Sequence, residues 1–271
     1  MAKEIKLIAL DCDGTLIADD RTITERTKKV LMKAQEKGIK VALVSGRPRT
    51  GFKFEIEQLA LDKHHGIIGA YNGGMVIDIE TNEVKYKQSL TNQDAKDFLK
   101  AIAHLNIIHI VDNGTDLYAN DADNQYVIHE YRDHDLKFNL THDLHERLDF
   151  DPMKILLTAD PDRIDEIDEE ILSICGDTFG AIRSTPFYLE ITSKGVNKSS
   201  ALDHICEGLN IAKNNVIAFG DQLNDMEMVR DAGIGVAMGN AHPDLKQVAD
   251  IVTDDNNNDG IAKVLEEILD L

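Results

Sequence analysis

Apolar runs alternate with amphipathic stretches near the start of the chain. The run Leu7–Leu10 precedes a segment from Thr24 to Lys37 with apolar residues at helical spacing, and the apolar run Ile39–Val44 follows. A strand, a helix and a strand within about 35 residues form a βαβ unit, whose strands lie parallel with a right-handed crossover. Thr24 is typical of a helix N-cap, and Gly38 is typical of a helix stop. The pattern predicts an α/β fold.

The same pattern continues to residue 88 and resumes after residue 190. Residues 1–88 and 190–271 are therefore predicted to form one discontinuous domain around a doubly wound, mostly parallel sheet. Further strands are expected at Gly66–Ala70, Met75–Ile79, Val84–Gln88, Asn215–Phe219, Ile234–Met238 and Ile251–Thr253, and further helices at about Thr50–Leu59, Ser199–Leu209, Met226–Ala232, His242–Val248 and from Gly260.

The pattern changes between residues 89 and 189, where short strands and two helices surround a polar middle rich in His and Asp. None of these strands ends in acidic residues as the earlier ones do. We therefore predict a separate α+β domain inserted into the first. Its helices are expected at Asn92–Ala103 and Asp162–Ile174, and its strands at Ile107–Val111, Asp116–Ala119, Lys154–Thr158, Gly180–Arg183 and Tyr188–Thr192.

Polar residues stand where the predicted parallel strands end. They are Asp11, Asp13, Ser45, Asn72, Asp221 and Asp225, and Lys198 stands at the start of a helix. Carboxyl ends of parallel strands meet at one edge of a sheet, where open α/β folds bind ligands. Converging carboxylates repel one another unless a hard cation bridges them, and oxygen ligands favour Mg²⁺. A hydroxyl and an ammonium are suited to hold phosphoryl oxygens. The first acidic pair alone is equally compatible with an ordinary Asp-Gly turn.

Composition and charge restrict the functional classes. The 271 residues are 42% hydrophobic and 29% charged, with a formal net charge of -20, which argues against general binding to nucleic acids or anionic membranes. The three cysteines are far apart and lack CxxC spacing, so neither a disulfide framework nor a zinc ribbon is indicated. The N-terminal apolar run is too short for a signal peptide, and we expect a cytoplasmic protein.

Four segments resemble the motifs of the haloacid dehalogenase superfamily of phosphohydrolases, in the same order. They are DCDGTL (11–16), VSGRP (44–48), KGVNKSSAL (194–202) and FGDQLNDMEM (219–228). NGG (72–74), GVAMGNA (235–241) and NNNDGIA (256–262) are similar to the Cof-type branch, which is often described as sugar-phosphatase-like. The resemblance implies a Mg²⁺-dependent hydrolase of phosphate esters of small metabolites, and the inserted domain would then act as its cap.

The resemblance also implies residue roles. Asp11 would attack phosphorus and form an aspartyl-phosphate, while Asp13 would first protonate the leaving alcohol and then activate water. Asp11, Asp221 and the backbone carbonyl of Asp13 would bind the metal, and Asp225 would be a second ligand or an anchor. The phosphoryl oxygens would be bound by Ser45 and Lys198.

Other positions and functions stay open. Arg47, Asn72, Gly73 and Asn224 are candidates for the substrate side of the site, although an arginine before a proline is also compatible with a solvated loop. Cys12 lies between the two acids, but strand alternation points it to the opposite face, where it would pack. A phosphotransferase or phosphomutase would use the same intermediate. A regulatory protein that binds metal without turnover is the non-enzymatic alternative.

Overall fold

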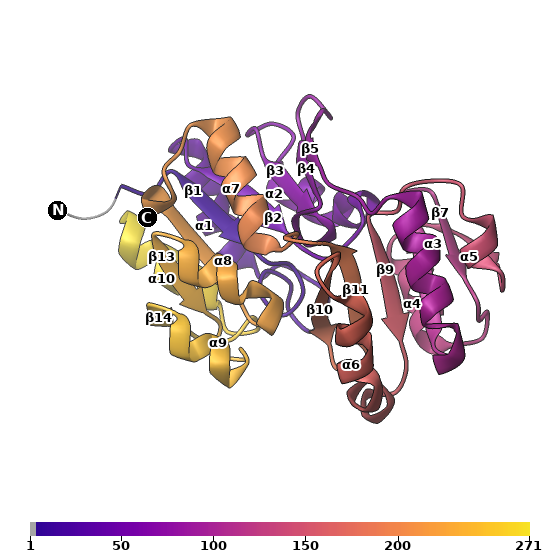
Figure 1. Ribbon diagram of the computed structural model, residues 1–271. Coiled ribbons are helices and arrows are strands. Elements are labelled where there is room, and N and C mark those ends of the chain that lie inside the picture. The colour runs from indigo at the N-terminus through magenta and orange to yellow at the C-terminus, as the bar shows by residue number, and fades with distance from the viewer. Residues whose placement is uncertain (1–3) are drawn as a thin grey trace. The chain divides into compact units, whose positions relative to one another are not determined.

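The computed structural model describes residues 4–271, which divide into two compact units (Figure 1). The first unit contains the chain up to Gly46 together with residues 52–87 and 197–271, and the second contains residues 47–51 and 88–196. The expected domain boundaries stay a prediction, and the one after residue 189 falls inside a strand of the second unit, Tyr188–Ser193.

The first unit is built on an eight-stranded sheet with the order β14-β13-β12-β1-β2-β3-β4-β5. The first six strands in this order are parallel, and the last two pair antiparallel as a hairpin. The strands are β1 (Leu7–Leu10), β2 (Lys40–Val44), β3 (Ile67–Ala70), β4 (Met75–Asp78), β5 (Val84–Lys87), β12 (Val216–Gly220), β13 (Ile234–Ala237) and β14 (Ile251–Val252). The predicted α/β class with a mostly parallel sheet is confirmed.

Helices cover both faces of the central strands of this sheet. All four residues of β1 are fully buried, as expected for a parallel strand packed on both sides. Leu7 and Ala9 share one apolar cluster with Ala201 and Ile205 of α7. The helices are α1 (Glu25–Glu36), α2 (Lys53–Leu59), α7 (Lys198–Leu209), α8 (Met226–Asp231), α9 (Pro243–Val248) and α10 (Gly260–Leu269).

The second unit has a six-stranded sheet with the order β10-β11-β9-β6-β7-β8, in which only β7 and β8 pair in parallel. One apolar cluster joins α3 and α6 to the sheet, and another contains Val127 of α4. The strands are β6 (Ile108–Asp112), β7 (Asp116–Ala119), β8 (Lys137–Leu140), β9 (Lys154–Thr158), β10 (Phe179–Thr185) and β11 (Tyr188–Ser193). The helices are α3 (Asn92–Ala101), α4 (Gln125–Asp133), α5 (Leu144–Arg147) and α6 (Pro161–Cys175).

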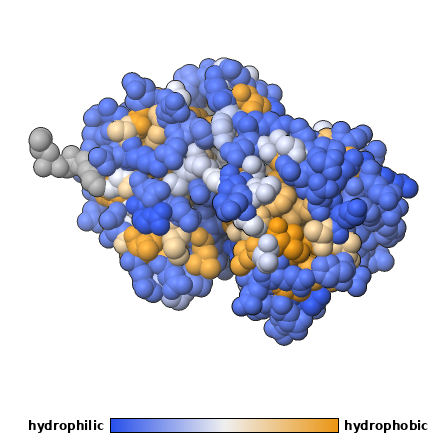
Figure 2. Space-filling model, in the orientation of Figure 1, coloured by the Kyte–Doolittle hydropathy of each residue, from blue (hydrophilic) through white to orange (hydrophobic). Residues whose placement is uncertain are grey.

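The polar middle of the second unit is more ordered than its sequence pattern indicates. It contains α4, β8 and α5, none of which the pattern predicts. The surface in Figure 2 is mostly hydrophilic, with apolar residues in separate patches. Within residues 4–271, no helix has the length and apolar character that crossing a membrane requires.

Candidate active site

Two neighbouring strands bring the first two acidic residues of the site together. β1 pairs with β12 in parallel, with Leu10 opposite Phe219, and the amide of Asp11 donates to the carbonyl oxygen of Phe219 at 3.1 Å. Asp11 and Asp221 are therefore the residues that follow each strand at the same edge of the sheet. Both side chains are buried. Because parallel strands end at the same edge of a sheet, these two carboxylates lie side by side.

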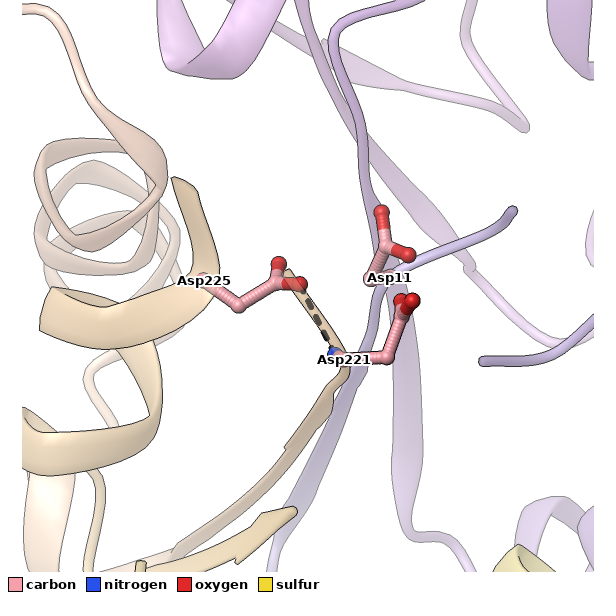
Figure 3. A group of neighbouring side chains, drawn as sticks. All are labelled: Asp11, Asp221 and Asp225. Carbon is pink, nitrogen blue, oxygen red and sulfur yellow. Dashed lines mark hydrogen bonds between the residues drawn. The ribbon is translucent and has the colours of Figure 1, made fainter. Parts of the chain in front are cut away.

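Asp225 joins this pair to form an acidic cluster. Asp11, Asp221 and Asp225 each offer a carboxylate oxygen, and these three oxygens lie within 4.8 Å of one another. Figure 3 shows the carboxylates of Asp11 and Asp221 next to each other, with Asp225 pointing toward them from a separate segment. An oxygen-only set of this size is suited to a hard divalent cation.

One ammonium group lies between two of these carboxylates. Lys198 Nζ donates to Asp11 Oδ1 and to Asp225 Oδ1, both at 2.6 Å, and the lysine side chain is 2% exposed. Burial acts to lower the pKa of Lys198, but the charges of Asp11 and Asp225 outweigh it and raise the pKa above its ordinary value. The neighbouring carboxylates therefore favour the charged form of Lys198.

The carboxylates are costly to ionise together. Burial raises the pKa of Asp11 well above its ordinary value; Lys198 opposes this shift, and Asp225 and Asp221 add to it. Burial is also the largest cause that raises the pKa of Asp221 to about 6, followed by the charge of Asp225. A cation bound among these oxygens would reduce their mutual repulsion.

Hydrogen bonds fix the loop that carries Asp221 and Asp225. Asp225 Oδ2 accepts from the amides of Asp221 and Gln222, both at 3.0 Å (Figure 3 draws the first). Thr15 Oγ1 donates to Asp221 Oδ1 at 2.9 Å, and Gln222 Nε2 donates to Asp221 Oδ2 at 3.1 Å. Both carboxylate oxygens of Asp225 thus accept hydrogen bonds, from Lys198 and from the loop amides, and these bonds anchor the loop. A role of Asp225 as a metal ligand stays a prediction.

Gly14 allows the loop after β1 to pass close to Asp221. Its φ is +82°, and a Cβ there would lie 2.5 Å from Asp221 Oδ2. A larger residue would therefore be strained by its backbone and would collide with the carboxylate. This packing explains why a glycine follows Asp13.

Ser45 and Asn72 are joined through the backbone. Ser45 follows β2 and is 3% exposed, and its carbonyl oxygen accepts from the amide of Asn72 at 2.9 Å. Asn72 Oδ1 accepts from Asn224 Nδ2 at 3.2 Å. Tyr71, Asn72 and Gly73 have φ values of 53°, 53° and 100°, and left-handed non-glycine residues of this kind often occur at functional sites. The turn therefore links Ser45 to Asn224, the residue before Asp225.

Two further predicted residues differ from these in their surroundings. Asp13 is exposed on the loop after β1, and its charge adds to the shift that raises the pKa of Asp11. Arg47 belongs to the second unit, where its Nη1 donates to the carbonyl oxygen of Gly51 at 2.8 Å. The structure brings together Asp11, Asp221, Asp225 and Lys198 in one group, and Ser45, Asn72, Gly73 and Asn224 in an adjoining one.

Sequence reasoning missed two residues that contact the acidic cluster. Thr15 and Gln222 both donate to Asp221. Thr15 lies in the motif DCDGTL and Gln222 lies in the motif FGDQLNDMEM. Their closeness in sequence to Asp11 and Asp221 is the feature of the sequence that could have identified them. Their contacts depend on how the loops fold back, which spacing alone does not give.

Comparisons with known proteins agree on one family. The family model described as haloacid dehalogenase-like hydrolase matches residues 8–265. A Bacillus subtilis protein named 5-amino-6-(5-phospho-D-ribitylamino)uracil phosphatase YcsE is 32% identical over 262 residues, which cover 97% of this chain and 95% of that protein.

Solved structures give the same result for the fold. A haloacid dehalogenase-like hydrolase from Bacteroides thetaiotaomicron superposes with a TM-score of 0.88 at 30% identity, covering 98% of this chain and 100% of that one. TM0651 from Thermotoga maritima superposes with a TM-score of 0.81 at 31% identity, covering 97% of both chains. The likeness thus extends over the whole chain, including the inserted segment.

Proposed function

This chain belongs to the haloacid dehalogenase-like hydrolases and is a phosphatase of that family, and on this premise we propose that it is a Mg²⁺-dependent phosphomonoester hydrolase. Its substrates would be small phosphorylated metabolites, sugar phosphates among them, and the reaction would pass through an aspartyl-phosphate on Asp11. The observation that carries the proposal is the buried Lys198 ammonium, 2.6 Å from Asp11, beside a cluster of three carboxylates.

The donor set fits Mg²⁺. Asp11 and Asp221 supply buried carboxylate oxygens, and burial first and the neighbouring carboxylates second raise the pKa of each group. We propose these two residues and the backbone carbonyl of Asp13 as ligands, with Asp225 as a further ligand or an anchor. When bound, the metal would neutralise charge on the carboxylates and on the phosphoryl group.

Asp11 is proposed as the nucleophile. Lys198 holds Asp11 Oδ1, so the carboxylate is fixed in orientation and Oδ2 is the oxygen left for attack. Attack forms the bond from Asp11 to phosphorus and breaks the bond from phosphorus to the ester oxygen. Lys198 and Ser45 would hold the non-bridging oxygens while this charge is redistributed.

Asp13 is proposed as the general acid and base. It gives its proton to the leaving alkoxide in the first step. As a carboxylate it then takes a proton from the water that attacks phosphorus, which releases inorganic phosphate and restores Asp11. The proton taken from water restores the acid form of Asp13 for the next turnover, and the exposure of Asp13 leaves it accessible to water.

The test is phosphate release from a generic aryl phosphate. We expect release that requires Mg²⁺, is lost on addition of EDTA, and is lost in Asp11→Asn. The matched control is Asp62→Asn, an exposed aspartate on the surface, which should keep wild-type activity. Full activity in Asp11→Asn would contradict the nucleophile assignment.

A screen of phosphorylated metabolites, ranked by kcat/KM, would then identify the leaving group. We expect phosphomonoesters of small polyols and sugars to rank highest. Phosphopeptides and 5′-phosphorylated oligonucleotides are assayed beside the metabolites, and a higher kcat/KM for either would contradict the proposed substrate class.

A further inference from the structure

The first turn of α7 is held by three separate sets of bonds. Asn197 and Ser200 form a reciprocal capping box. Lys198 Nζ is bonded to Asp11 and Asp225. Ser199, which is 5% exposed, donates its hydroxyl to Asp231 Oδ2 at 2.7 Å. The capping box explains why the helix starts here, and the lysine contacts belong to the candidate active site. Neither set of bonds requires a hydroxyl group at residue 199.

Ser199 and Lys198 attach α7 to opposite ends of α8. Lys198 binds Asp225, the residue just before α8, and Ser199 binds Asp231, the last residue of that helix. A six-residue helix is about 9 Å long. Two attachments this far apart resist rotation of α8 against α7, whereas the Lys198 attachment alone would act as a pivot.

Lys213 reinforces the second attachment. Its Nζ lies 2.6 Å from Asp203 Oδ1 on α7 and 4.0 Å from Asp231 Oδ2 on α8. It also donates to Ser199 Oγ at 3.5 Å. The serine hydroxyl therefore accepts from an ammonium while it donates to a carboxylate, which strengthens both bonds.

We propose that Ser199 is a positioning residue for Lys198. Through Asp231 it fixes the first turn of α7 against α8, so that the ammonium stays between Asp11 and Asp225. This inference rests on the proposed function, in which Lys198 holds phosphoryl oxygens. Misplacing such a group by 1 Å costs as much as about 100-fold in rate, and losing one of several anchors should cost less.

The test compares Ser199→Ala, Ser199→Thr, Asp231→Ala and the double variant Ser199→Ala with Asp231→Ala. In Ser199→Ala we expect kcat to fall by about 3- to 10-fold and inorganic phosphate to inhibit more weakly, with KM changed less than kcat. Ser199→Thr keeps the hydroxyl and should recover most of kcat. The double variant should be no slower than the slower single variant, because both lose the same bond.

The control is Ser173→Ala, a loss of an exposed hydroxyl on α6, which should leave kcat and phosphate inhibition unchanged. A Ser199→Ala protein with a lower Tm but wild-type kcat and wild-type phosphate inhibition would overturn the positioning role. A wild-type protein that neither releases nor binds phosphate would overturn the proposed function and this inference together. Additive losses in the double variant would show that Ser199 does not act through Asp231.

Discussion

Lys198 carries one positive charge among carboxylates that outnumber it. It contacts Asp11 and Asp225 directly, and Asp221 lies in the same cluster. Removing one partner of a buried ion pair leaves the other charge without compensation, which is the costly way to break such a pair. We therefore expect the lysine to stabilise the metal-free site in addition to its proposed role in binding the phosphoryl group.

Lys198→Met tests both roles at once. We expect kcat to fall by at least about 100-fold, because a donor to the phosphoryl oxygens is lost. The free energy of unfolding without metal should fall by up to about 3–5 kcal/mol, as measured by urea denaturation. The exposed Lys263→Met is the control and should change neither quantity much. Wild-type activity in Lys198→Met would contradict the assignment.

The site residues that directly follow parallel strands could be predicted from the sequence. Asp11, Ser45 and Asp221 follow parallel strands, and parallel strands end at a common edge whatever the loops do. Thr15 and Gln222 could not be predicted in the same way, because their hydrogen bonds to Asp221 depend on loop conformation and rotamers. Motif order, rather than spacing, pointed to Lys198.

Elements of the second unit were harder to predict than those of the first. In α4 only Val127 is buried, with the partly buried Tyr126 and Tyr131 packed in the same cluster, so the apolar face of this helix is small; α5 has only four residues. β8 is an edge strand without a fully buried residue. Periodicity reports burial, so elements that bury little leave little signal in the sequence.

α4 also carries Glu130, whose side chain is 12% exposed, and we expect its carboxyl group to make stability depend on pH. Burial is the main cause that raises the pKa of Glu130 from 4.5 to about 7; Lys154 opposes the shift, and Glu190 adds to it. Glu130 also lies 3.6 Å from His134 Nε2, and Tyr188 and Asp112 face it. A folded-state pKa above the unfolded value stabilises the protein at low pH, and this stabilisation is lost as the pH rises through 7.

Glu130→Gln should therefore change the pH profile of unfolding. The wild-type free energy of unfolding, relative to that of the variant, should fall by as much as about 3 kcal/mol between about pH 5 and pH 8. Thermal or urea unfolding of both proteins across this range measures the difference. A difference that is constant, or that grows with pH, would contradict the raised pKa.

At the scale of the whole molecule, three carboxylates face one ammonium in a strongly negative protein, and the proposed metal would supply the positive charge that offsets them. The formal net charge is -20, so an anionic substrate is not attracted from a distance. We propose that recognition takes place at contact, through Lys198, Ser45 and the metal. We propose that the second unit selects the leaving group.

Mg²⁺ should stabilise the folded chain beyond any general effect of salt. At about 100 times its dissociation constant, a ligand that binds only the folded state adds about 2.7 kcal/mol. The control is NaCl at matched ionic strength, because salt alone relieves repulsion in a protein of charge -20. The Mg²⁺-specific rise in Tm should vanish in Asp221→Asn. An equal rise in wild type and variant would place the ion elsewhere.

The parallel part of the first unit's sheet was predictable because β1, β2, β3 and β12 are buried apolar runs followed by polar turns. For the second unit, the sequence pattern predicted only the positions of the longer helices and of most strands. Its antiparallel order places β9 between β6 and β11, which are far apart in the sequence. No local pattern specifies such pairings.

The most direct test of the central claim is to trap the covalent intermediate. Asp13→Asn should slow hydrolysis of the intermediate, so we expect a rapidly quenched reaction of this variant with Mg²⁺ and an aryl phosphate to accumulate phosphoenzyme. Peptide mass spectrometry should find one added phosphoryl group on Asp11, and none in a protein that also carries Asp11→Asn. A phosphoryl group on another residue, or turnover without any phosphoenzyme, would contradict the account.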